Sequence, residues 1–130
     1  MMKKLVLVLF VGLLAISLNA QEKSAKIEFK SDTVDYGNIE KGSDGLRVFQ
    51  FTNTGNAPLI ISKVNSSCGC TIPKSPEGPI LPGKTGEIQV KYDTNRVGPI
   101  RKAITVISNA DTPTVVLKIK GDVKDAVVVQ

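Results

Sequence analysis

The stretch Thr85-Gly86-Glu87-Ile88-Gln89-Val90-Lys91-Tyr92-Asp93 alternates polar and apolar side chains over most of its length. Successive side chains of a β-strand point to opposite sides, so Ile88, Val90 and Tyr92 share one face. The other face carries the polar side chains of Glu87, Gln89, Lys91 and Asp93. This pattern predicts a strand that packs one face against a core and turns the other to solvent.

The rest of the chain repeats this kind of segment. Short β-type runs are separated by Gly, Pro and Asn at intervals of roughly eight to twelve residues, and no segment keeps a helical period. The predicted strands span residues 26–30, 34–39, 46–54, 59–64, 85–93, 100–108 and 114–121. About seven strands predict an all-β fold, an immunoglobulin-like β-sandwich. The antibody form is excluded, because the two cysteines lie two positions apart and the chain has no tryptophan.

Two segments depart from simple alternation. Residues 59–64 begin nearly all apolar, which predicts either a strand buried on both sides or one adjusted by a bulge. Further on, prolines recur at positions 73, 76, 79 and 82, and each removes a backbone donor from any ladder. We therefore expect an ordered but irregular crossing here rather than a central strand.

The first twenty residues have the plan of a secretory signal peptide. Two lysines precede an apolar run over residues 5–18, and Ala20 supplies a small residue before a cleavage point at Gln21. The run is shorter than the roughly 20 apolar residues of a spanning helix. We expect cleavage, no stable membrane span afterwards, and export to the periplasm or out of the cell. An uncleaved anchor is the alternative.

The chain therefore divides into four parts. Residues 1–20 form the signal peptide, 21–25 a polar lead, 26–123 the sandwich domain and 124–130 a C-terminal tail. The 130 residues suffice for one domain. Within the tail, residues 127–129 are all valine, and they could extend the last strand or offer an edge to a partner.

Composition limits the chemistry that the protein could perform. The chain has no histidine, the residue most used for proton transfer near neutral pH and for binding metals, so we expect no enzyme and no cofactor. Without the signal peptide, the basic excess is mild and the lysines are scattered along the sequence. This predicts a solvated surface rather than binding of nucleic acid. We interpret Arg101, Lys102, Lys118 and Lys120 as outward-facing strand positions.

Both cysteines, Cys68 and Cys70, lie in one loop with a single glycine between them. They could form a disulfide, bind copper(I) as a free dithiol, or form bonds between molecules. A disulfide here would close a ring of three residues and contribute about 1.6 kcal/mol at most, so stapling the fold does not explain it. The fourth possibility is an inert pair packed against one end of the sandwich.

Several blocks of sequence together resemble one bacterial family. They are residues 35–39 with Gly42, residues 49–59, residues 66–71 with Pro73, residues 80–83 and much of 86–94, and Ser108-Asn109 with Gly121. Over about residues 30–123 the chain resembles the family catalogued as domain of unknown function 1573, and the Cys68-Gly69-Cys70 block makes the resemblance specific. The resemblance implies an immunoglobulin-like fold, similar to the hydin-type and major-sperm-protein domains, and export from the cell. It implies no established activity, substrate or catalytic residue.

These observations lead to one expectation and one alternative. We expect an exported, non-catalytic immunoglobulin-like module that binds an envelope or extracellular protein, or has a structural role, at the bacterial cell envelope. No nucleic-acid partner is expected. The alternative is a small thiol redox or copper(I)-binding protein that uses Cys68 and Cys70.

Overall fold

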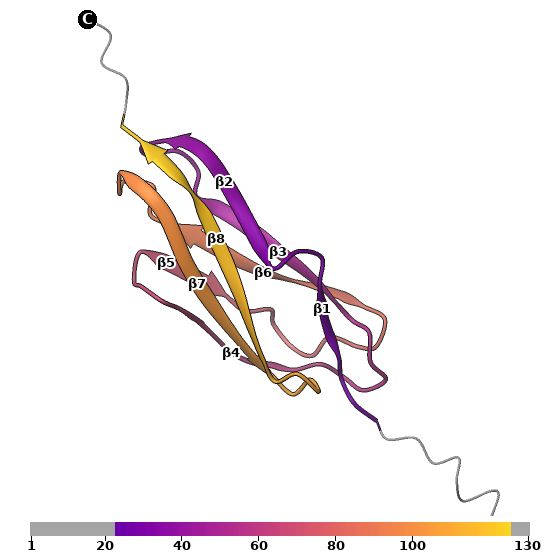
Figure 1. Ribbon diagram of the computed structural model, residues 1–130. Coiled ribbons are helices and arrows are strands. Elements are labelled where there is room, and N and C mark those ends of the chain that lie inside the picture. Colours follow the sequence, from indigo (N-terminus) through magenta and orange to yellow (C-terminus); the bar gives the residue numbers. More distant parts are fainter. Residues whose placement is uncertain (1–22, 126–130) are drawn as a thin grey trace, which may run out of the picture.

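Figure 1 shows the computed structural model as two β-sheets packed face to face. The structure describes residues 23–125, so the expected signal peptide and residues 126–130 of the tail lie outside it. Sheet 1 has the order β1 (Ile27–Phe29), β3 (Leu46–Asn53), β6 (Thr85–Tyr92) and β5 (Thr71–Lys74). Sheet 2 has the order β2 (Thr33–Glu40), β8 (Thr114–Lys124), β7 (Gly98–Ser108) and β4 (Ile61–Ser66). The all-β, immunoglobulin-like prediction is confirmed, and between residues 23 and 125 no helix is suited to crossing a membrane.

The chain changes sheets soon after it begins. β1 pairs with only three residues of β3, from Phe51 to Asn53, and the chain then crosses to β2 in sheet 2. At the start of this crossing, Lys30 N–H donates to the Gln50 carbonyl at 2.9 Å. The start of β3, from Leu46 to Phe49, therefore has β6 on one side and no strand of residues 23–125 on the other. All paired neighbours are antiparallel except β2 and β8, which run parallel.

Alternating side chains from both sheets fill the space between them. Because side chains alternate along a strand, a run in which every second residue is buried identifies the inward face. The fully buried large side chains include Phe49, Phe51, Ile88 and Val90 from sheet 1 and Ile104, Val106, Leu117 and Ile119 from sheet 2. Each contributes about 1.5–3 kcal/mol of burial free energy. The inward face predicted for residues 85–93, with Ile88, Val90 and Tyr92, is confirmed.

Residues 23–125 form eight strands rather than about seven. The extra one is β5, which pairs with β6 in the register Ile72↔Lys91 and Pro73↔Val90. The sequence suggested an irregular crossing here because of the prolines, and for Thr71–Lys74 that expectation is wrong. β5 is an edge strand with a partner on one side only, which is where a sheet tolerates proline.

Two other boundaries also differ from the prediction. The strand expected over residues 59–64 begins at Ile61, while Leu59 is fully buried and forms an isolated bridge with Ile80. A register shift between Ile61 and Lys63 shows that a bulge adjusts this strand, which was one of the two alternatives. At the other end, β8 continues past Gly121 to Lys124, beyond the predicted strand.

A bulge in β2 brings two glycines together. The parallel register between β2 and β8 shifts between Asp35 and Asn38, around Gly37, whose φ is +66°. Gly121 of β8 lies against this bulge with φ +149°, and a Cβ there would lie 2.8 Å from the Cβ of Tyr36. Only glycine fits this close approach of the two strands.

Candidate functional site

Cys68 and Cys70 lie in the turn that carries the chain from β4 in sheet 2 to β5 in sheet 1. Their sulfur atoms form a disulfide, with 5.4 Å between the two Cα atoms. Cys70 is part of the buried core, with 8% of its surface exposed, and the half-buried Cys68 packs against that core. The disulfide therefore links the half-buried Cys68 of the turn to Cys70 in the core of the sandwich.

Backbone hydrogen bonds hold the turn to both sheets. On sheet 2, Ser67 N–H donates to the Ala103 carbonyl at 2.9 Å, and Ala103 N–H donates to Ser67 Oγ at 3.1 Å. On sheet 1, Asp93 N–H donates to the Cys70 carbonyl at 2.8 Å. These bonds do not involve the sulfur atoms, so they would persist if the disulfide were reduced.

A backbone hydrogen bond reaches the sulfur atom of Cys68. The backbone N–H of Cys70 donates to Cys68 Sγ at 3.1 Å. This bond holds the Cys68 sulfur against the backbone of Cys70. Among residues 23–125, no group of three or more His, Cys, Asp or Glu side chains is placed to hold a metal ion.

A second feature is an exposed apolar surface on the outer side of sheet 1. Leu46, Val48 and Ile72 are 42%, 41% and 67% exposed. Leu46 pairs directly with Lys91, and Lys91 pairs with Ile72, so the three side chains form one row across β3, β6 and β5. The methylene groups of a lysine in such a row cover apolar surface while its ammonium stays in water. We call Leu46, Val48, Ile72 and Lys91 the apolar face.

The unpaired start of β3 borders this apolar face. Where β1 has ended, a hollow of about 430 Å³ opens beside β3, lined by Lys30, Ser31, Val34, Val48, Phe49, Gln50 and Glu87. Asp44 Oδ1 accepts the N–H of Leu46 at 3.0 Å, and the Arg47 guanidinium donates to the Leu46 carbonyl at 2.8 Å. Val48 is the next residue with the same orientation, and no strand lies beside it. A short extended segment could pair with β3 there.

Among the described residues, Tyr36 is the titratable group whose pKa is most clearly shifted by its environment. Burial raises the pKa of its phenol to about 12, although the Arg47 guanidinium, 4.3 Å from the ring centroid, acts in the opposite direction. The hydroxyl donates to the Gly45 carbonyl at 2.8 Å. A phenol held in this way stays protonated at neutral pH and acts as a structural donor rather than as an acid or base.

Sequence reasoning selected the cysteines and missed the residues that gather on the sheet surfaces. Leu46, Val48 and the exposed Gln50 alternate with the buried Phe49 and Phe51, so the alternation of this strand could have found them. On sheet 2, Arg101, Lys118 and Lys120 are exposed and line one hollow, although they are scattered in the sequence. Lys102 has the parity of the buried Ile100 and Ile104, so its interpretation as an outward position is wrong.

Residues 27–123 match the family model described as "Protein of unknown function (DUF1573)". The chain belongs to the DUF1573 family. The match covers most of the sequence and confirms the resemblance seen in the sequence blocks. No curated protein sequence matches this DUF1573 chain significantly.

Solved structures with the same fold come from several kinds of protein. A protein of unknown function from Porphyromonas gingivalis W83 aligns with a TM-score of 0.68 and 20% identity, over 77% of this chain and 47% of that one. The ASH/PapD-like domain 7 of human CEP192 aligns with a TM-score of 0.67 and 11% identity, over 83% and 92%. A chain of the CsuC–CsuE chaperone–tip adhesion subunit complex of Acinetobacter baumannii aligns with a TM-score of 0.54 and 12% identity, over 77% and 58%. At these identities the likeness shows the fold alone, and this DUF1573 chain spans about half the length of the P. gingivalis protein.

Proposed function

We propose that this DUF1573 chain is an exported, non-catalytic immunoglobulin-like module that binds another protein at the bacterial cell envelope. The observation that carries the proposal is the apolar face on sheet 1. Exposed apolar side chains that gather on one surface, with polar groups around them, are typical of protein contacts. Of the three apolar side chains, Ile72 is the most exposed, at 67%, so binding would remove the largest fraction of its surface from water.

The unpaired edge at the start of β3 indicates how a partner could bind. A partner segment that pairs beside Val48 would continue sheet 1 in the position that β1 leaves empty. Backbone hydrogen bonds of this kind give affinity, and alternate side chains of the added segment give specificity. The hollow beside Val48 and Val34 would receive one of those side chains.

The proposed location at the cell envelope has two supports. The N-terminal twenty residues have the order of charged, apolar and small residues that a secretory signal requires. The Csu complex, with which the chain shares its fold, belongs to the chaperone–usher pili of A. baumannii. Removal of the signal is tested by the intact mass of protein purified from the native cells, which is expected to correspond to a chain that begins at Gln21. A full-length mass would contradict it.

The absence of catalysis is also part of the proposal. The chain has no histidine to move protons near neutral pH. The Tyr36 hydroxyl donates to the Gly45 carbonyl, and its raised pKa keeps the phenol neutral. Both facts favour a binding role, in which shape and apolar contact matter more than proton transfer.

Photo-crosslinking in living cells tests the binding function. A photoreactive amino acid placed at Val48 or Ile72 is expected to give a discrete crosslinked protein, because both side chains would lie at the contact. The matched controls are Leu81 and Val97, which are 54% and 51% exposed but lie outside sheet 1. Equal products from all four positions, or none from Val48 and Ile72, would refute the proposal.

A second candidate function is thiol chemistry at the turn between β4 and β5. The observation that favours it is the Cys70 N–H that donates to Cys68 Sγ, because this donor lies beside a sulfur that would take part in thiol–disulfide exchange. Cys68 is also the less buried of the two cysteines. A redox pair would use Cys68 as the attacking thiolate, and the reduced pair offers the two soft ligands that copper(I) prefers.

Counting thiols on exported protein, with and without reductant, distinguishes these candidates. A thiol protein would exchange readily between the two states and bind copper(I) when reduced. A disulfide that resists glutathione, with no copper(I) binding after forced reduction, would leave the binding module as the sole candidate. The Cys68→Ser/Cys70→Ser variant is expected to keep its crosslinks at Ile72 if binding is the function.

A further inference from the structure

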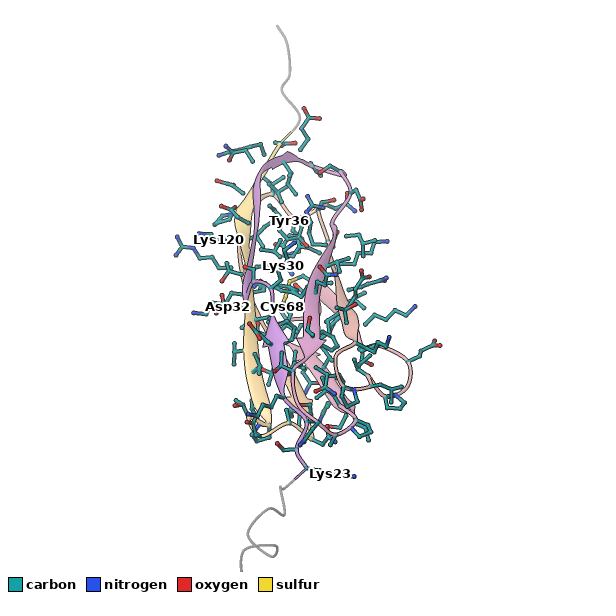
Figure 2. All side chains as sticks on the ribbon, turned by 90° about the vertical axis from the view of Figure 1, so that its right-hand side faces the viewer. Lys23, Lys30, Asp32, Tyr36, Cys68 and Lys120 are labelled. Carbon is teal, nitrogen blue, oxygen red and sulfur yellow. A yellow bond between two sulfur atoms is a disulfide. The ribbon has the colours of Figure 1, made fainter. Side chains whose placement is uncertain are left out.

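We propose that the outer side of sheet 2 carries an anion-binding site for a phosphate or pyrophosphate group. The site is a shallow hollow of about 670 Å³ over β2, β8 and β7, next to the cysteine turn. Its cationic side chains are Arg101, Lys118 and Lys120, and no acidic residue of the described part of the chain lines it. In Figure 2, Lys120 projects from β8 away from the body of the sandwich.

Strand register explains why these cations meet. Arg101 of β7 lies directly opposite Lys120 of β8, and Ala103 lies opposite Lys118. Side chains directly opposite on one face have Cβ atoms about 4.5–5.5 Å apart. The small Ala103 leaves the hollow open between longer neighbours. Lys102 and Ile119 also line it, and alternation turns their side chains inward, so they contribute their backbones.

The arrangement is electrostatically unfavourable without a ligand. Like charges directly opposite one another, such as Arg101 and Lys120, destabilise a sheet. Lys120 also pairs in register with Asp35 of β2, whose carboxylate accepts the Gly37 N–H at 2.8 Å; among the described residues the two side chains form no ion pair. Within residues 23–125, the ion pair that the structure contains is Lys124–Asp122, which leaves the three cations of the hollow without a carboxylate partner.

The hollow is more positive than the domain as a whole. Residues 23–125 contain fifteen basic and eleven acidic side chains, so the two signs nearly balance. In the hollow, Arg101, Lys118 and Lys120 gather with no described acidic residue in the lining, which leaves a local excess of positive charge. A polyvalent anion in the hollow would remove the repulsion between Arg101 and Lys120 and balance that excess.

The hydrogen-bond donors favour a phosphate-type group. A guanidinium presents paired donors that match phosphate oxygens, and lysines add point charges. The hydroxyl of Ser67, at the margin of the hollow, accepts the Ala103 N–H and so keeps its own hydrogen to donate to a ligand. Pyrophosphate, with several charges, suits three cations better than one carboxylate does. The site belongs to sheet 2, so it does not depend on the apolar face of sheet 1.

Titration with pyrophosphate, followed by amide NMR spectra, tests the site. Saturable shifts are expected at residues 101–103 and 118–120, with an affinity that weakens as salt is added. Lys118→Gln/Lys120→Gln is expected to weaken binding at least about tenfold, because two charge-assisted contacts are lost. The matched control, Lys74→Gln/Lys84→Gln, removes the same charge from exposed positions outside the hollow and is expected to bind as the original protein does.

A second arm identifies the source of the phosphate group. Vesicles that contain phosphatidic acid are compared with vesicles of phosphatidylcholine alone in a sedimentation assay. Binding to the former together with pyrophosphate shifts at the hollow indicates a lipid headgroup, and shifts without vesicle binding indicate a soluble phosphate compound. The proposal is overturned if neither probe binds, if shifts are spread over all lysines, or if the two double variants weaken binding equally.

Discussion

Asn53 is a fully buried polar side chain at the end of β3, and its amide group is completely hydrogen-bonded. Its Oδ1 accepts the N–H groups of Lys26 at 3.2 Å and Gly55 at 3.0 Å. Its Nδ2 donates to the carbonyls of Ala57 at 2.8 Å and Ile80 at 2.9 Å. One side chain therefore connects the residue before β1, the turn after β3 and the segment before β6.

Replacing this residue tests its structural role. Asn53→Ala is expected to lower the free energy of unfolding by about 3 kcal/mol or more, because four partners lose their bonds in a buried place. Urea denaturation gives the value. Thr52→Ala, one residue away and half-buried, is the control and is expected to change stability by about 0.5 kcal/mol or less. Equal effects of the two substitutions would contradict the role assigned to Asn53.

Tyr36 makes stability depend on pH in the alkaline range. Its pKa is about 12 in the folded protein, against 10.0 for the free phenol, because burial disfavours the charged form. The folded state thus binds the phenol proton more strongly than the unfolded state does. The contribution of this difference to the free energy of unfolding is complete below pH 10 and is lost as pH rises towards 12. Thermal melts over this range are expected to fall more steeply for the original protein than for Tyr36→Phe. Parallel pH profiles would contradict the assignment.

At the scale of the elements, β2 and β8 depend on the contact between Gly121 and the bulge at Gly37. Gly121→Ala is expected to cost about 2–3 kcal/mol, because its Cβ would lie 2.8 Å from the Tyr36 Cβ and 2.9 Å from the Gly37 carbonyl oxygen. Chemical denaturation measures the loss. Gly69→Ala is the control, since no atom lies within 4 Å of its added Cβ, and a comparable loss there would refute the steric explanation.

The turn between β4 and β5 is expected to fold without its disulfide. Cys68→Ser/Cys70→Ser should lower the free energy of unfolding by no more than about 1.6 kcal/mol, because the closed ring has only three residues. The bonds from Ser67 to Ala103 and from Asp93 to Cys70 remain available to the backbone. Circular dichroism and urea denaturation check this outcome. An unfolded variant would show that the pair is essential to the fold.

Individual elements differ in how far their sequences reveal them. β6 was predictable because Ile88, Val90 and Tyr92 alternate without interruption. β5 was not, because Pro73 argues against a strand unless its place at a sheet edge is known. The hollow on sheet 2 was hidden for a related reason. Arg101 and Lys120 become neighbours only through the register of β7 and β8, which no local pattern specifies.

At the scale of the whole molecule, the two outer surfaces have different chemistry. Sheet 1 presents the apolar face with Leu46, Val48 and Ile72, and sheet 2 presents the cations of the hollow. The sandwich separates them by the thickness of its core, so substitutions on one side have no shared partners with those on the other. Effects on crosslinking at Ile72 and on pyrophosphate binding at Lys118 are therefore expected to be additive.

The course of the chain also determines how the domain responds to a pulling force. Lys23 lies at one end of the sandwich, and β8 finishes at the opposite end (Figure 2). β2 and β8 are parallel neighbours, so tension between the two ends of the domain would slide them past each other along their length. The ladder from Thr33↔Lys118 to Glu40↔Lys124 would then bear the load all at once, rather than opening one bond at a time. Such a domain would resist extension, a property suited to a link under mechanical stress.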